Sequence, residues 1–138
     1  MLRGKLKPKS KTVLLIDDES PWLQMMSTAL KGASFKVITA DSGEAALKKL
    51  QTNRPDLIVS DVRMPVMNGF DLFEKVRSMP KFRRVPYVFM SSLDDFDAKR
   101  VAKTLGVDDY VTKPINTEEV KTIILDLLSR FRTTRQAK

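Results

Sequence analysis

Four groups of polar residues in this 138-residue chain each come after a short apolar run. In chain order they are Asp17 with Asp18, Asp61, Ser91 with Ser92, and Lys113, of which Asp61 and Lys113 are separated from their runs by one residue. Carboxylates brought to one place repel one another, so such a cluster persists where a cation neutralises it. A carboxylate beside Mg²⁺ and an ammonium group is equipped to accept a phosphoryl group, and a hydroxyl such as that of Ser91 can donate to a phosphate oxygen. The residue types therefore indicate metal-assisted phosphoryl transfer to a carboxylate.

Each group taken alone also has an ordinary structural explanation. An Asp pair after a strand often caps a helix, a single Asp caps a loop, and Ser-Ser or Lys-Pro pairs form turns. Tyr110 alone fits an aromatic residue in the core of a strand. The chemical interpretation depends on all the polar groups falling at strand ends of one sheet, separated by whole β-α units.

Five apolar runs alternate with segments of helical periodicity, and they predict the sheet that positions these groups. The runs are residues 13–16, 35–38, 57–59, 85–90 and 110–111. Most are continuously apolar, which is typical of parallel strands covered on both faces. Five β-α units with right-handed crossovers predict a single parallel sheet between two helix layers. In such sheets the functional crevice lies at the carboxyl ends of the strands.

Capping residues predict where the helices begin and end. Ser20 as N-cap before Pro21 predicts a first helix that ends at Gly32, and Asp41 with Glu44 predicts the start of a second. A third helix is predicted over residues 69–79. Asp94 predicts the start of a fourth helix that ends at Gly106, and Asn116 with Glu119 predicts the start of the last.

The composition excludes several classes of site. The chain has no cysteine and no histidine, so disulfides, thiolate or imidazole metal ligands and histidine-based catalysis are excluded. Any metal must bind oxygen ligands, which favours Mg²⁺, Ca²⁺ or Mn²⁺. No apolar run reaches the length of about 18 residues that a membrane span needs, and the basic first ten residues lack the apolar region of a secretory signal. We expect a cytoplasmic protein without membrane contact.

The net charge of +8 comes from the two ends of the chain. Residues 1–11 and the segment from residue 130 onward are basic and contain no acid, so the part between them is close to neutral. We interpret these ends as solvated tails and expect no direct nucleic-acid binding by the domain. The predicted organisation is a basic tail at 1–11, one domain at 12–131 and a basic tail at 132–138. The second tail is too short for an output domain, so the chain either acts alone or is a fragment of a longer protein.

Four segments together resemble the receiver domain of two-component response regulators, a CheY-like family. They are residues 13–19 (VLLIDDE), 61–69 (DVRMPVMNG), 85–92 (VPYVFMSS) and 106–114 (GVDDYVTKP). Each segment alone is a weak signal, but all four occur in the right order and spacing, and the match covers residues 12–130. The resemblance implies a flavodoxin-like (βα)5 fold with strand order 2-1-3-4-5.

The resemblance also assigns roles to the polar residues. It implies that Asp61 accepts a phosphoryl group from a phosphohistidine on a sensor histidine kinase or histidine phosphotransfer protein. Asp17, Asp18, Asp61 and the backbone carbonyl of Arg63 would hold Mg²⁺, for which Mn²⁺ could substitute. Lys113 would pair with the acyl phosphate, and its peptide bond to Pro114 is cis in the family.

Two further residues would carry the switch itself. Ser91 stands at the switch hydroxyl position and Tyr110 at the switch aromatic position. Their movement would reshape the face made by the fourth helix, fifth strand and fifth helix, through which a homodimer could also form. A domain of this kind is regulatory and is no enzyme beyond assisting its own phosphorylation and dephosphorylation.

Three departures from the commonest family pattern border or follow these residues. Ser92 replaces a frequent alanine, Ile115 replaces a frequent phenylalanine, and Arg63 is long and charged. We hypothesise that Arg63 and Ser92 tune the acyl-phosphate lifetime by controlling the access of water.

Two other protein classes with similar folds each require a motif after the first strand that this chain lacks there. Haloacid-dehalogenase enzymes need an Asp-x-Asp motif and flavodoxins a Ser/Thr/Gly-rich phosphate loop, and neither follows the first strand. The remaining alternative is a protein-interaction module that works without phosphorylation.

Overall fold

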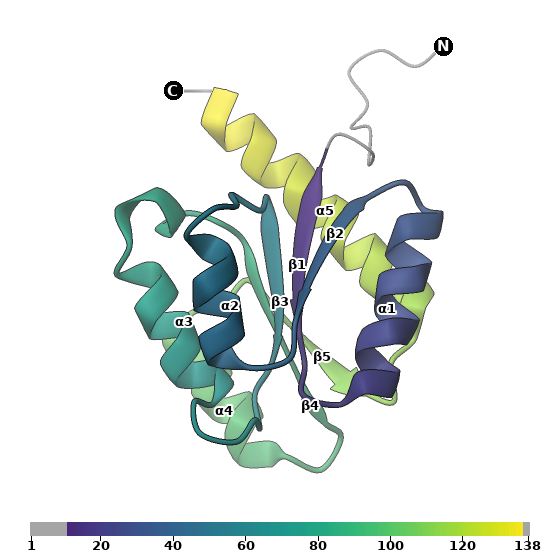
Figure 1. The fold of residues 1–138 in the computed structure, drawn as a ribbon, viewed down its shortest axis with the longest axis vertical. Coiled ribbons are helices and arrows are strands. Elements are labelled where there is room, and N and C mark those ends of the chain that lie inside the picture. The colour runs from purple at the N-terminus through teal and green to yellow at the C-terminus, as the bar shows by residue number, and fades with distance from the viewer. Residues whose placement is uncertain (1–10, 137–138) are drawn as a thin grey trace.

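The computed structural model describes residues 11–136, and their side chains as far as residue 130, as alternating strands and helices (Figure 1). The strands are β1 (Thr12–Ile16), β2 (Lys36–Ala40), β3 (Leu57–Asp61), β4 (Tyr87–Ser92) and β5 (Asp109–Lys113). The helices are α1 (Ser20–Gly32), α2 (Gly43–Leu50), α3 (Gly69–Arg77), α4 (Phe96–Leu105) and α5 (Thr117–Gln136), with a 3-10 turn η2 (Pro80–Phe82). Of the predicted first tail only Lys11 is described, and α5 continues past the predicted boundary at residue 131.

The strands form one parallel sheet in the order β2-β1-β3-β4-β5, which confirms the predicted topology. In the centre of the sheet, Leu14 of β1 lies opposite both Ile38 of β2 and Ile58 of β3. At the end of β3, Asp61 lies opposite Met90, one residue before Ser91. Because all strands run the same way, the polar residues that end them are collected at one edge of the sheet.

Alternate strand residues contact the two helix layers, which explains why the strands are continuously apolar. One core lies between the sheet and helices α2, α3 and α4, and it contains Leu14, Ile16 and Phe89. The other lies between the sheet and helices α1 and α5, and it contains Leu15 and Val59. Figure 1 shows the same arrangement, with α1 and α5 on one side of the sheet and α2 and α3 on the other. Burial on both faces supplies the main driving force for this fold.

The helix starts differ from three predictions by a single residue each. Helix α1 is preceded by Glu19 as N-cap. In α2 and α4 the side chains of Ser42 and Asp95 accept the capping hydrogen bonds, in place of the neighbouring aspartates. Adjacent capping residues are chemically equivalent, so the path of the preceding loop decides which of them faces the helix end. The predicted cap of α5 is confirmed by a bond from the Glu119 N–H to Asn116 Oδ1 of 3.1 Å.

The predicted helix ends agree more closely. Helix α1 ends at Gly32, and α4 ends at Gly106 in the left-handed conformation with φ of 75°. A residue without a Cβ adopts that conformation at little cost. Among the described residues no helix is long and apolar enough to cross a membrane.

Candidate functional site

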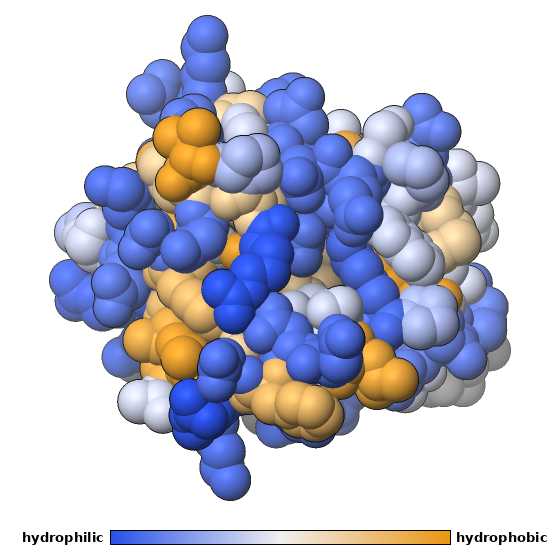
Figure 2. Space-filling view, turned by 90° about the horizontal axis from the view of Figure 1, so that it is seen from below, coloured by the Kyte–Doolittle hydropathy of each residue, from blue (hydrophilic) through white to orange (hydrophobic). Residues whose placement is uncertain are grey.

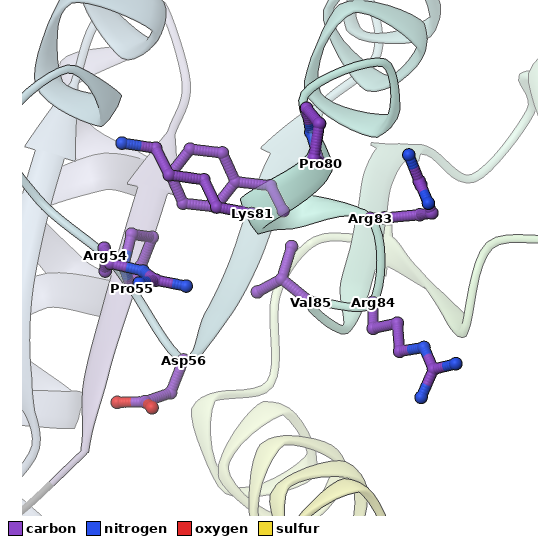
Figure 3. Close-up of a pocket in the computed structure, with 9 residues that line it drawn as sticks. Arg54, Pro55, Asp56, Pro80, Lys81, Arg83, Arg84 and Val85 are labelled. Carbon is purple, nitrogen blue, oxygen red and sulfur yellow. The ribbon is translucent and has the colours of Figure 1, made fainter. Parts of the chain in front are cut away.

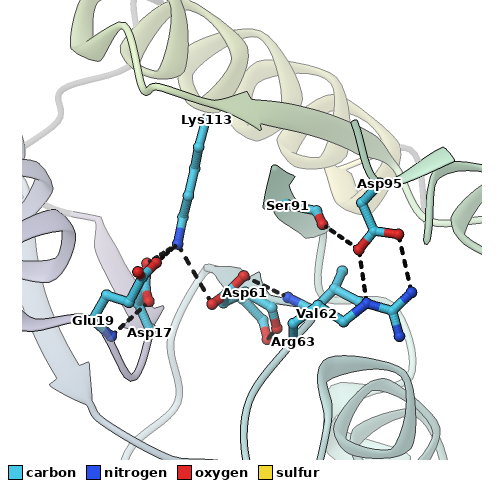
Figure 4. A network of polar contacts seen from close by, with 9 residues as sticks. Asp17, Glu19, Asp61, Val62, Arg63, Ser91, Asp95 and Lys113 are labelled. Carbon is cyan, nitrogen blue, oxygen red and sulfur yellow. Dashed lines mark hydrogen bonds and ion pairs between the residues drawn. The ribbon is translucent and has the colours of Figure 1, made fainter. Parts of the chain in front are cut away.

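The polar residues predicted to act together do meet at the carboxyl edge of the sheet (Figure 4). Asp17 follows β1, Asp61 ends β3, Ser91 lies near the end of β4 and Lys113 ends β5. Asp61, Ser91 and Lys113 border a cleft of about 240 Å³. Asp18, Glu19, Arg63 and Ser92 also line it. In the view onto this end of the molecule, hydrophilic residues cover the middle and patches of hydrophobic residues border them (Figure 2).

The approach of α3 to β3 requires a glycine at the edge of this cleft. A Cβ added to Gly69 would lie 2.2 Å from the backbone oxygen of Asp61 and 2.9 Å from the Cα of Val62. The Gly69 N–H donates to the Val62 carbonyl at 2.8 Å, which fixes the start of α3 against the end of β3. The glycine of the 61–69 segment therefore lets the helix pack directly on the backbone that carries Asp61.

One side of the cleft, which we call the acid side, consists of Asp17, Glu19, Asp61 and Lys113. The Lys113 ammonium lies 2.6 Å from Glu19 Oε1, 3.0 Å from Asp17 Oδ2 and 3.5 Å from Asp61 Oδ2. Asp17 and Asp61 are almost fully buried, and the Lys113 side chain is 10% exposed. The peptide bond between Lys113 and Pro114 is cis, as the family resemblance implied. Three carboxylates thus share one ammonium group, and two of them are buried while Glu19 is exposed.

The acid side has the chemistry of a divalent metal site. Carboxylate oxygens of Asp17, Glu19 and Asp61 all lie within 4.8 Å of one another. Asp17 Oδ2 is buried and forms an ion pair with the Lys113 ammonium, but it accepts no hydrogen bond from the residues that the structure describes. A buried acceptor without a donor is costly, and a cation bound by hard oxygen ligands would satisfy it. The residues present therefore fit a magnesium-type ion.

The structure distinguishes the two acids that follow Asp17. The predicted ligand Asp18 lines the cleft but is exposed and outside the compact group of carboxylates. Glu19, which we had not predicted as a site residue, lies within that group and bonds Lys113 at 2.6 Å. The signal for Glu19 was present in the sequence, since it continues the acidic run after β1. Its side chain position depends on Lys113, which lies 94 residues away.

Burial and neighbouring charges shift the pKa values of Asp61 and Lys113 on the acid side. Burial raises the pKa of Asp61 to about 7, and the charge of Asp17 adds to the effect while that of Lys113 opposes it. Burial alone would lower the pKa of Lys113, but its hydrogen bond to Glu19 and its ion pair with Asp17 raise that pKa above the usual range. The Lys113 ammonium is therefore charged at neutral pH. Its charge does not offset the burial of Asp61 and the repulsion from Asp17, so the pKa of Asp61 stays raised.

The other side of the cleft, which we call the hydroxyl side, consists of Ser91, Asp95 and Arg63. The buried Ser91 hydroxyl donates to Asp95 Oδ2 at 3.0 Å. Arg63 binds the same carboxylate with two nitrogens, at 2.7 Å from Nε and 3.0 Å from Nη2. The Arg63 guanidinium holds the pKa of Asp95 well below its usual range, and the N–H of Ala98 and the Ser91 hydroxyl contribute in the same direction.

Asp95 had not been predicted as a site residue. Its position four residues after Ser91, at the start of a helix, was the available signal. The sequence placed the helix cap one residue earlier, at Asp94. In the structure Asp94 instead accepts a bond from the Ser92 hydroxyl at 3.1 Å, so Ser92 faces solvent at the rim of the cleft.

Tyr110, the predicted switch aromatic, lies on β5 and packs against the core beneath α4. Its hydroxyl is buried and has no hydrogen-bond partner in the described part of the chain. Burial raises the pKa of Tyr110, so the phenol stays neutral at ordinary pH. The Tyr110 hydroxyl, which lies beside β4 and β5, is therefore available to form a new hydrogen bond.

A larger hollow of about 510 Å³ lies at the opposite, amino end of the sheet. Arg54, Lys81, Arg83 and Arg84 line it, but their side chains extend in different directions (Figure 3). Its one acid, Asp56, already accepts a bond from the Thr12 N–H at 2.8 Å. The hollow lacks buried polar groups aimed at a common point, so the smaller cleft is the candidate site.

Comparisons with known proteins identify the family and the fold of this chain. The family model described as the response regulator receiver domain matches residues 13–125. The chain is 39% identical to protein RcaC of Microchaete diplosiphon, over 87% of this chain and 18% of that protein. It is 35% identical to the alkaline phosphatase synthesis transcriptional regulatory protein PhoP of Bacillus subtilis, over 88% of this chain and 50% of that protein.

A solved structure shows the same fold. The chemotaxis response regulator CheY4 of Vibrio cholerae superimposes with a TM-score of 0.74 at 35% identity, covering 87% of this chain and 97% of that one. The chain spans half or less of the length of the two curated relatives. The resemblance therefore concerns one domain of those proteins.

Proposed function

Because this chain belongs to the response regulator receiver domain family, we propose that it is the phosphoacceptor switch of a two-component phosphorelay. Asp61 accepts the phosphoryl group, and Asp17, Asp18, Asp61 and the backbone carbonyl of Arg63 would hold Mg²⁺. The observation that carries the proposal is the buried Asp61 carboxylate, which shares a single ammonium with two other acids. When bound, Mg²⁺ would supply positive charge that offsets the charge on the transferring phosphoryl oxygens.

In the transfer, an Asp61 carboxylate oxygen attacks the phosphorus of a phosphohistidine on a partner kinase or phosphotransfer protein. The new P–O bond forms as the P–N bond breaks, and the imidazole leaves with its electron pair. Lys113 exchanges its bonds with Glu19 and Asp17 for a bond to a phosphoryl oxygen. Hydrolysis of the acyl phosphate by water later restores the carboxylate and releases inorganic phosphate.

The Asp61 environment supports this role. The Val62 N–H donates to Asp61 Oδ1 at 2.9 Å, which fixes the orientation of the carboxylate. Asp61 Oδ2 faces the Lys113 ammonium at 3.5 Å. The raised pKa means that the ionised Asp61 carboxylate is less stable here than in water. A cation that approaches it therefore interacts with it more strongly than it would in water.

The signal is passed on by the hydroxyl side of the cleft. Ser91 donates to the new phosphoryl group, and Tyr110 takes up a new position next to β4. These movements reshape the face formed by α4, β5 and α5, where a partner or a second copy of the chain binds. Arg63 and Ser92, at the rim of the cleft, set the access of water and hence the lifetime of the acyl phosphate.

The test is incubation with Mg²⁺ and acetyl phosphate followed by intact-mass measurement. The wild type should gain one phosphoryl group, and Asp61→Asn should gain none. Asp56→Asn is a matched control, because Asp56 lies at the other end of the same strand and should leave the adduct unchanged. No adduct on the wild type, or an adduct that survives in Asp61→Asn, would favour the phosphorylation-independent interaction module.

A further inference from the structure

The Asp95 carboxylate is bonded by four donors from three parts of the chain. Its Oδ2 accepts from the Ser91 hydroxyl at 3.0 Å and from Arg63 Nε at 2.7 Å. Its Oδ1 accepts from Arg63 Nη2 at 3.0 Å and from the Ala98 N–H at 3.1 Å. A carboxylate offers about four acceptor positions, so all of them are used here. Figure 4 shows Asp95 reached by Ser91 on one side and Arg63 on the other.

The bond from Ser91 has a direct consequence for phosphorylation. A serine hydroxyl has a single proton to donate, and here it is donated to Asp95. Ser91 is 1% exposed, so water does not readily replace a lost partner. A phosphoryl group on Asp61 must therefore compete with Asp95 for this proton.

The same carboxylate connects the cleft to α4. Asp95 is the N-cap of α4, and it accepts from the Ala98 N–H in the first turn. Arg63 follows Asp61 by two residues, so the loop after β3 is tied to the same point. Phe96, the first residue of α4, is 74% exposed. Displacement of Ser91 thus changes the bonding of the residue that begins α4.

We propose that Asp95 is a positioning residue that holds the domain in its unphosphorylated arrangement by retaining the Ser91 hydroxyl and the Arg63 guanidinium. Phosphorylation of Asp61 draws Ser91 away from Asp95, and the loss of this bond alters the start of α4. The inference rests on the proposed function, because it names the group against which the phosphoryl group competes.

The matched variants are Asp95→Asn and Asp97→Asn. Asparagine caps helices about as well as aspartate, so Asp95→Asn preserves the start of α4 while it removes the charge and one acceptor. Asp97 lies in the same first turn but is exposed and pairs only on the surface with Arg100 at 2.8 Å. The two variants therefore change the net charge equally, and Asp97→Asn leaves the hydrogen bonds of Ser91 and Arg63 to Asp95 in place.

The measurement is the initial rate of adduct formation with acetyl phosphate and Mg²⁺, followed by intact mass. We expect Asp95→Asn to react about fivefold faster than the wild type, since one hydrogen bond no longer favours the unphosphorylated arrangement. Asp97→Asn should react within about twofold of the wild type. In a Ser91→Ala background, Asp95→Asn should give little acceleration, because the bond that it removes is already absent.

The outcomes separate this inference from the proposed function. If the wild type forms the adduct but Asp95→Asn and Asp97→Asn react at the same rate, Asp95 has no positioning role and the proposed function stands. Equal acceleration with and without the Ser91 hydroxyl would show that Asp95 acts only through helix stability or charge, which also overturns the inference. If the wild type forms no adduct, the proposed function fails first, and this inference fails with it.

Discussion

Each side of the cleft contains carboxylate and cationic side chains, but the two sides differ in how many donors each carboxylate has. On the acid side three carboxylates share the ammonium of Lys113, and a buried oxygen of Asp17 accepts no hydrogen bond within the described part of the chain. On the hydroxyl side a single carboxylate, Asp95, receives four donors. Acceptors outnumber donors on the first side, so that side can still bind a cation. On the second side all acceptor positions of Asp95 are already used, so a new partner can bind only by replacing an existing one. This suits a residue that holds a conformation.

The pKa values of the two central carboxylates express this difference. Burial raises the pKa of Asp61 to about 7, whereas the Arg63 guanidinium lowers that of Asp95. Both are aspartates close to the carboxyl ends of neighbouring strands. Their environments alone decide which one gains from added positive charge.

The largest expected effect comes from removing the cation on each side in turn. Lys113→Met keeps the apolar stem but leaves two buried carboxylates without a counter-charge, and we expect it to lower the unfolding free energy by about 3 kcal/mol. Arg63→Met breaks a pair whose arginine side chain is 57% exposed and should cost less than about 1 kcal/mol. Urea unfolding of both variants in EDTA at pH 7 measures the contrast. Equal losses would mean that the two sides do not differ in burial as described.

A second effect concerns pH, and it is confined to the acid side. In metal-free protein the pKa of Asp61 is raised from 3.8 to about 7, so protonated Asp61 favours the folded state. This stability is fully present below pH 3.8 and is lost as the pH rises towards about 7. Asp61→Asn removes that loss. We expect it to exceed the wild type in unfolding free energy by about 2 kcal/mol above pH 7, a value reduced by half because the cleft opens to solvent.

Unfolding curves in EDTA across this pH range provide the check. Asp97→Asn, which removes an exposed acid of α4, is the control variant. An advantage of Asp61→Asn that grows as the pH falls would contradict the described environment of Asp61.

The smallest effect distinguishes the acids that follow Asp17. If Asp18 is a metal ligand, Asp18→Asn should weaken Mg²⁺ binding by at least about tenfold. Glu19→Gln should change it by less than about threefold, because Glu19 bonds Lys113 and is not a proposed ligand. Fluorescence of Trp22, the only tryptophan, can follow the titration, since its ring lies 5.6 Å from the Lys113 ammonium. The reverse order of effects would assign the metal to Glu19.

The fold was predictable from the sequence because its determinants are local or periodic. Continuously apolar strand segments such as residues 13–16 indicate burial on both faces, and right-handed crossovers then leave few topologies. Helix starts were less certain where two capping residues are adjacent, as at Asp94 and Asp95. Either can accept the capping bond, and the route of the loop after β4 decides between them.

The candidate site divides in the same way. The sequence by itself determined that Asp17, Asp61, Ser91 and Lys113 converge, because each directly follows or ends a parallel strand and such ends meet at one edge. Only the tertiary structure decided that Glu19 turns to Lys113 and that Asp95 binds both Ser91 and Arg63. These contacts join side chains from different β-α units, and their geometry follows from loop paths and rotamers that no short-range sequence pattern encodes.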